Sequence, residues 1–223
     1  MQPVGIAGPA GRLEGRLEEP DDGARRVSRF GVICHPHPLH GGTLDNKVVH
    51  TLARALHDLG VPTVRFNFRG VGASEGRYDS GIGETDDALA VVGWARRRWP
   101  DAAPWLLGFS FGGVIAIRAA ARAGARLLVT VAPAVGRRID PAVRDEKEIP
   151  IGEALPACPW LIIQGDADEV LDAGSVLEWA SRQVPAPQVR VSRGAGHFFH
   201  GRLPELRAAV EAFAHESGAQ PVG

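Results

Sequence analysis

The sequence predicts an α/β protein with a mostly parallel central sheet and helices on both faces. Strand-like and helix-like segments alternate from residue 30 almost to the end of the chain, which requires crossover connections and hence parallel strands. The strand segments are short apolar runs, such as Phe30–Cys34 and Trp160–Ile163, typical of strands buried on both faces. Glycine-rich loops follow several of these runs, so we expect sharp turns at the sheet edge.

The individual elements can be assigned in order along the chain. Residues 2–19 alternate in polarity around a turn at Gly8–Gly11, which predicts a hairpin that adds antiparallel strands at one sheet edge. The later helices are indicated by apolar residues at helical spacing and end at breakers such as Gly60 and Pro100. Strands are expected at residues 30–34, 61–68, 105–107, 126–133, 160–163 and 189–192, and helices at 48–59, 84–98, 113–121, 175–184 and 203–216.

Composition is that of an ordinary globular protein. The 223 residues suffice for one domain, expected to span residues 1–223 with a frayed tail at 218–223. A net charge of −1 gives no electrostatic case for a nucleic-acid or anionic-membrane partner. We find no signal-peptide pattern and no apolar run near the ~18 residues of a membrane span, so we expect a cytoplasmic protein. Cys34 and Cys158 adjoin apolar runs and are expected to be small hydrophobic residues without a disulfide. The sequence does not indicate an oligomeric state.

The central motif of the chain is the pentapeptide Gly108–Gly112, which reads Gly-Phe-Ser-Phe-Gly. An apolar strand leads into it and a helix-like stretch follows it, which is the context that gives G-x-S-x-G the meaning of a nucleophile elbow. Such a turn holds its serine in a strained conformation, and small residues on either side let strand and helix pass closely. The motif therefore predicts that Ser110 is a nucleophile.

Other polar residues follow other strands of the predicted sheet. The carboxyl ends of parallel strands meet at one edge, so this edge should collect the loop 35–42, Ser110, Asp166 or Asp168, and His197. A serine hydroxyl needs a neutral histidine to take its proton, and the histidine needs a carboxylate at its other nitrogen. The chain order Ser, Asp, His is the one expected on a fold of this type.

The chain resembles the α/β-hydrolase superfamily, and within it the small cap-less serine hydrolases of the dienelactone-hydrolase-like group. The resemblance extends from about residue 30 to residue 213. It is carried by His-Pro-His-Pro-Leu-x-Gly-Gly at 35–42, Asn-Phe-Arg-Gly-x-Gly-x-Ser-x-Gly at 67–76 and Gly-Phe-Ser-Phe-Gly-Gly at 108–113.

The resemblance implies roles for individual residues. Ser110 is expected to be the nucleophile and His197 the base. In the pattern Gly-Asp-x-Asp-x-Val the second acid matches the family's triad member, which makes Asp168 the expected acid. Asp166 is the alternative, with a structural role in binding loop amides as its expected use.

Two backbone N–H groups are needed for an oxyanion hole. One is expected from Phe111, directly after the nucleophile, and the other from the loop after Cys34. The two prolines of that loop have no N–H. His37 and Leu39 therefore both stay open, with a slight preference for Leu39.

Three further interpretations concern the neighbouring loops and the connection at 134–158. His35, His37 and His40 suggest a metal site, but no acid lies in that stretch to complete the ligand set, so we expect neither a metal nor a cofactor. Arg69 is a candidate to line the cleft and meet a carboxylate or phosphate of a substrate. Residues 134–158 are too few for a cap, so a shallow, open cleft for small or exposed acyl substrates is expected.

Together these features predict a serine hydrolase that cleaves carboxylic esters, or related acyl bonds of a small-molecule substrate, through an acyl-enzyme. A thioesterase, a dienelactone-type hydrolase and a peptidase are alternatives within the enzymes. A non-catalytic binding protein on the same fold is the alternative of another class. A histidine base predicts that kcat/KM falls on the acid side, below about pH 6–7.

Overall fold

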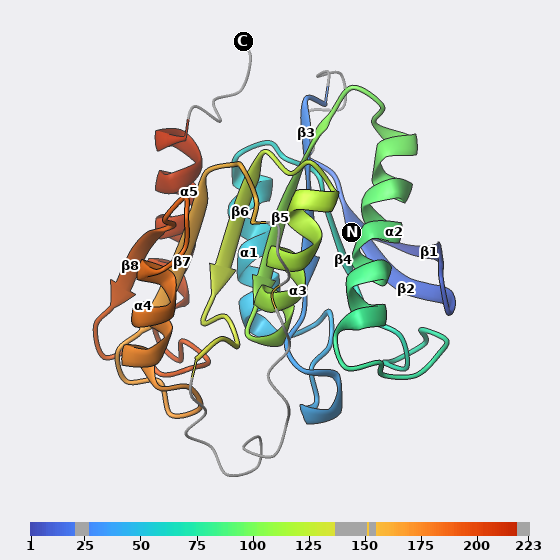
Figure 1. Ribbon diagram of the computed structural model, residues 1–223. Coiled ribbons are helices and arrows are strands. Elements are labelled where there is room, and N and C mark those ends of the chain that lie inside the picture. Colours follow the sequence, from blue (N-terminus) through green and yellow to red (C-terminus); the bar gives the residue numbers. More distant parts are fainter. Residues whose placement is uncertain (21–26, 137–150, 152–154, 218–223) are drawn as a thin grey trace.

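The computed structural model describes residues 1–20, 27–136, 151 and 155–217. A single eight-stranded sheet runs through the molecule, with helices on both sides (Figure 1). The predicted tail at 218–223 and most of the connection at 134–158 lie outside the described residues. None of the helices in these ranges is long and apolar enough to cross a membrane.

The sheet has the strand order β1-β2-β4-β3-β5-β6-β7-β8. β1 pairs antiparallel with β2, and β2 pairs antiparallel with β4, whereas all later neighbours are parallel. This confirms the predicted parallel sheet with an antiparallel N-terminal hairpin at one edge. The strands are β1 (Gln2–Gly8), β2 (Gly11–Glu18), β3 (Arg29–Cys34), β4 (Thr63–Phe66), β5 (Ala103–Phe109), β6 (Leu127–Val131), β7 (Trp160–Gly165) and β8 (Gln188–Ser192).

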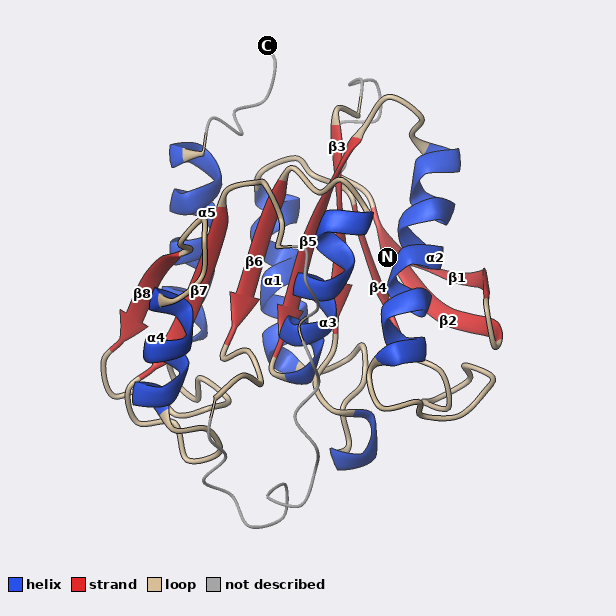
Figure 2. Ribbon diagram, viewed as in Figure 1, coloured by secondary structure: helices blue, strands red, loops and turns tan. Residues whose placement is uncertain are grey.

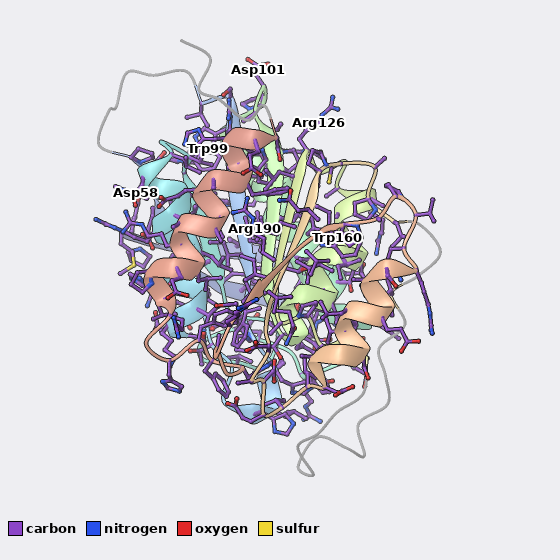
Figure 3. All side chains as sticks on the ribbon, turned by 90° about the vertical axis from the view of Figure 1, so that its left-hand side faces the viewer. Asp58, Trp99, Asp101, Arg126, Trp160 and Arg190 are labelled. Carbon is purple, nitrogen blue, oxygen red and sulfur yellow. The ribbon has the colours of Figure 1, made fainter. Side chains whose placement is uncertain are left out.

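Helices cover the two faces in separate layers. Figure 2 shows them around the sheet, and Figure 3 shows α5 and α4 on opposite sides of it. One apolar core lies between the sheet and α1 with α5, and another lies between the sheet and α2 with α3. The helices are α1 (Lys47–Asp58), α2 (Ile82–Arg98), α3 (Phe111–Arg122), α4 (Ala173–Ser181) and α5 (Leu203–Glu216), with a short 3-10 helix η1 (Pro38–His40).

The ends of α4 differ from the prediction, which placed this helix at residues 175–184. The helix begins earlier because Asp172 caps it, its carboxylate accepting a hydrogen bond from the Ser175 N–H at 3.0 Å. It ends at Ser181, ahead of Pro185. Both cysteines are free, as expected, with Cys34 buried in β3 and Cys158 half-buried.

The carboxyl ends of the parallel strands point toward the lower edge in Figure 1, where η1 and the loops after β5, β7 and β8 gather. Trp99, Asp101 and Arg126 mark the opposite edge (Figure 3). The polar residues singled out by the sequence all follow strands at the lower edge.

Candidate active site

Ser110 occupies the sharp turn between β5 and α3. Its φ of 55° and ψ of −118° are unusual for a residue with a side chain, and such strain costs about 1–3 kcal/mol. The flanking glycines are required sterically. A Cβ on Gly108 would lie 2.0 Å from the Gly112 carbonyl oxygen, and one on Gly112 would lie 2.3 Å from the Cys34 carbonyl oxygen. The turn therefore has the geometry of a nucleophile elbow, with the helix start pressed against the loop after β3.

Three of the predicted side chains meet at this turn. His197, in the loop after β8, has its Nε2 3.0 Å from the Ser110 Oγ. Its Nδ1 lies 2.8 Å from the Oδ2 of Asp168, in the loop after β7. A carboxylate only accepts, so Nδ1 carries the proton and the Nε2 lone pair faces the serine hydroxyl. The arrangement lets the hydroxyl proton pass to His197 while Asp168 offsets the charge that forms.

Asp168 is buried, with 7% of its surface exposed. Burial by itself raises the pKa of this carboxyl, but hydrogen bonds from His197 and from the backbone outweigh it and hold the pKa below its usual value. The N–H groups of Val170 and Leu171 donate to Oδ1 at 2.9 and 2.8 Å. Asp168 therefore stays ionised beside the histidine.

The alternative acid, Asp166, has a different partner. Its Oδ1 accepts a hydrogen bond from the Gly194 N–H at 2.6 Å, which ties the loop after β7 to the loop after β8. Of the two acids in the motif, the structure thus brings Asp168 to His197 and gives Asp166 the structural contact.

Two polar residues that the sequence analysis missed also belong to this network. The carboxylate of Glu169 accepts a hydrogen bond from the His197 backbone N–H at 2.9 Å. The amide of Gln164 donates to Asp168 Oδ2 at 2.9 Å. Gln164 breaks the apolar run of β7, which is a signal the sequence does contain. Glu169 is exposed, and no sequence pattern distinguishes it from other surface acids.

We expect Glu169→Ala to lower kcat/KM about tenfold, because the His197 backbone loses its acceptor and the loop loosens; tenfold corresponds to about 1.4 kcal/mol. Glu169→Gln keeps an acceptor oxygen and should stay within about threefold of the wild type. Steady-state kinetics on both variants, with the melting temperature as a folding control, tests this. Equal losses in the two variants would mean that the charge, and not the hydrogen bond, matters.

The first N–H of α3 belongs to Phe111 and has no acceptor within the helix, because helices leave their first amides unpaired. It is therefore available to an oxyanion. Of the two loop candidates, Leu39 is disfavoured because its N–H donates to His37 Nδ1 at 3.1 Å. His37 lies beside the elbow, with its ring centroid 4.8 Å from that of Phe111. The hydrogen bond made by the Leu39 N–H weighs against the slight preference for Leu39 and leaves His37 as the other loop candidate.

His35 has a structural environment that accounts for it without a metal. The ring is fully buried, its Nδ1 donates to the Pro36 carbonyl at 2.6 Å and its Nε2 accepts from the Phe68 N–H at 3.0 Å. Both ring nitrogens are thus in use. Within the described residues, no group of three or more His, Cys, Asp or Glu could hold a metal ion.

Burial lowers the pKa of His35 to about 3, so the native state keeps this ring neutral. An unfolded histidine takes up a proton near pH 6.5, so stability is lost as the pH falls from about 6.5 toward 3. We expect this group to remove about 2 kcal/mol of unfolding free energy between pH 7 and pH 5. Urea unfolding at both pH values measures the loss. His35→Gln, which keeps a donor and an acceptor but does not titrate, should reduce the difference; an unchanged difference would contradict the assignment.

Arg69 does not have the free guanidinium expected of a residue that meets a substrate anion. Its Nη2 and Nε donate to the two carboxylate oxygens of Asp87 at 2.7 and 3.0 Å, and Asp87 is fully buried in α2. Asp79 lies 3.8 Å from its Nη1. The expectation that Arg69 lines the cleft is corrected accordingly: its charge is matched inside the protein, where the pair fixes the loop after β4 to α2.

The chain is similar to known proteins over much of its length. The family model for serine aminopeptidase, S33, matches residues 37–153, a span that includes the elbow. An uncharacterised protein of Rickettsia prowazekii is 32% identical over 222 residues, covering 96% of this chain and 88% of that protein. A Xanthomonas campestris protein described as a serine hydrolase without a lid superposes with a TM-score of 0.86 and 37% identity, over 100% of this chain and 96% of the other. A serine hydrolase homologue from Coxiella burnetii superposes with a TM-score of 0.81 and 43% identity, over 95% of this chain and 96% of the other.

Proposed function

The chain belongs to the α/β-hydrolase superfamily of serine hydrolases, and we propose that it cleaves carboxylic esters or related acyl bonds through an acyl-enzyme on Ser110. The observation that carries this proposal is the unbroken hydrogen-bond chain from Ser110 through His197 to Asp168.

The reaction proceeds in two halves. In the first, the Ser110 hydroxyl passes its proton to His197 Nε2 while Oγ bonds to the carbonyl carbon. The N–H groups of Phe111 and His37 hold the resulting oxyanion, and the bond to the leaving group breaks as His197 returns the proton to it. In the second half, water gives a proton to the same nitrogen while its oxygen bonds to the acyl carbon. The bond between that carbon and Ser110 Oγ then breaks as His197 returns the proton to Oγ, which releases the acid and restores Ser110.

The surroundings of the site favour a small acyl substrate without a strongly anionic group. Arg69, in the loop after β4, is matched by Asp87, as described above. Leu39 and Phe198 are exposed apolar side chains that adjoin the oxyanion loop and the base, with 66% and 36% of their surfaces accessible. They supply apolar contacts for the acyl or leaving group.

Peptide hydrolysis is the second candidate, because the family model that matches the chain is that of a serine aminopeptidase. An aminopeptidase must also recognise a free amino group, which calls for an acidic or carbonyl acceptor close to the nucleophile. Glu169 is an exposed acid near His197, but its Oε2 accepts from the His197 backbone. We therefore rank ester cleavage first.

A fluorophosphonate probe tests the proposal directly. The probe should label a single serine in the folded protein, and mass spectrometry should find the adduct on the peptide that contains Ser110. A panel of p-nitrophenyl acetate, an acyl thioester and an amino-acyl p-nitroanilide then separates the bond classes, with the ester expected to be the best substrate. Folded protein that takes up no label and hydrolyses none of the three would support the binding-protein alternative.

A further inference from the structure

Gln164 is a polar residue inside an otherwise apolar strand. The preceding residues of β7, from Trp160 (labelled in Figure 3) to Ile163, are apolar and buried. Gln164 is itself fully buried, and strand alternation places its side chain on the same sheet face as Trp160 and Ile162. A buried amide loses its hydration, so each of its polar atoms should find a partner.

Only one end of this amide is satisfied. The Nε2 donates to Asp168 Oδ2 at 2.9 Å and to the Gly165 carbonyl at 3.1 Å. Within the described part of the chain, Oε1 is buried without a hydrogen-bond partner. The reverse orientation of the amide is ruled out by chemistry, because the carboxylate of Asp168 can only accept and so must face the NH2 group. The orientation that lets Nε2 donate to Asp168 therefore leaves Oε1 without a donor.

Gln164 donates to the same Asp168 oxygen that accepts the hydrogen bond from His197. Asp168 Oδ2 is also the atom that receives the Nδ1–H of His197 at 2.8 Å, while the backbone N–H groups of Val170 and Leu171 occupy Oδ1. Gln164 completes the set of donors around the carboxylate. With it in place, the carboxylate plane is fixed and part of the charge on Oδ2 is directed away from His197.

Packing alone gives no reason for this residue. A methionine has nearly the same length and volume, fills irregular space in cores and carries no polar atom that burial would leave unpaired. We propose that Gln164 is a positioning residue: it orients the Asp168 carboxylate and limits how strongly that carboxylate holds the protonated form of His197. This inference rests on the proposed function, since it assigns Gln164 a role only if Asp168 and His197 act in acyl transfer.

The matched variant is Gln164→Met. Gln164→Met removes the unpaired acceptor, which stabilises the fold, and also the two hydrogen bonds donated by Nε2, which destabilises it. The variant is therefore expected to keep a melting temperature within a few degrees of that of the wild type. Its kcat should fall about tenfold at unchanged KM, the size expected for losing one hydrogen bond to a charged group. The acid limb of the kcat/KM profile should move to higher pH, because Asp168 now attracts the proton on His197 more strongly.

Two further variants separate this role from a packing role. Ile162→Val changes packing on the same face of β7 without touching Asp168, so it should alter the melting temperature and leave the pH profile in place. Gln164→Glu introduces a carboxyl whose proton is retained by burial and by the charge of Asp168. It can donate to Oδ2 and should restore kcat toward the wild-type value near neutral pH.

A purely structural Gln164 would give the opposite pattern. Gln164→Met would then keep the wild-type kcat and pH profile whatever its melting temperature, and that result overturns the proposal. The low-field proton resonance of His197 Nδ1–H supplies a readout that needs no substrate. It should move in Gln164→Met and stay in place in Ile162→Val. If wild-type protein neither hydrolyses esters nor takes up the probe, the proposed function fails, whereas a resonance that is the same in all variants refutes the role of Gln164.

Discussion

Ser110→Ala is expected to lower kcat for ester hydrolysis by about 10⁴- to 10⁶-fold, the range found when the nucleophile of a triad is removed. The expectation follows from the position of the hydroxyl. It is held at the turn by the positive φ of Ser110 and lies 3.0 Å from His197 Nε2, where its proton can leave. Alanine keeps the Cβ and the backbone conformation but removes the atom that bonds to the substrate. Activity should be measured under single-turnover and steady-state conditions.

The residual activity of this variant is itself informative. The N–H groups at the start of α3 and in the loop after β3 remain in place, so the variant should still bind substrate and exceed the rate in water by about 10³- to 10⁴-fold. It should take up no fluorophosphonate and show an unchanged melting temperature within a few degrees. A Ser110→Ala protein that turns over esters at the wild-type rate would remove the nucleophile from the proposed mechanism.

The sequence predicted most reliably what depends on local structure. The elbow was recognisable because the strand, the glycines and the helix that create it are contiguous in the chain, and the steric demands at Gly108 and Gly112 follow from that contiguity. The alternation of strands and helices predicted a parallel sheet, and the loops that follow parallel strands meet at one edge of the sheet. This placed Ser110, Asp168 and His197 at the same edge. The parallel sheet and the hairpin could be predicted from period and turn patterns alone, and the structure confirms them.

What could not be predicted depends on contacts between distant segments. Asp87 lies on the buried side of α2, and only the fold shows that it matches Arg69. The hydrogen bond that weighs against Leu39 as the second oxyanion donor lies inside a proline-containing loop. Side-chain direction at such places is set by packing around the loop, which periodicity does not encode.

Asp168→Asn is expected to lower kcat by about 10⁴-fold while the protein stays folded, because the substitution selects the wrong tautomer of His197. The backbone N–H groups of Val170 and Leu171 donate to Oδ1, so the amide oxygen of the new side chain must take that position. Its NH2 group then occupies the Oδ2 position, opposite His197 Nδ1. The imidazole can only accept there, which moves its proton to Nε2, and a protonated Nε2 cannot take the proton of Ser110.

The same substitution acts on Gln164, and this makes the test sharper. The NH2 group of Gln164 would face the NH2 group of the asparagine at position 168. The Gln164 amide should therefore rotate and present its unpaired Oε1 to that asparagine. The rotated amide pairs its Oε1 but moves its NH2 group away from the Gly165 carbonyl, so the melting temperature should stay within a few degrees of that of the wild type. A collapse of activity without loss of the fold is a combination that general damage to the fold does not produce. Asp166→Asn is the matched control: Asp166 accepts from Gly194 and not from His197, so its kcat should stay within about threefold of the wild type. If kcat collapsed in Asp166→Asn and not in Asp168→Asn, the acid of the triad would be Asp166. The hydrogen bond from His197 to Asp168 would then have no part in the chemistry.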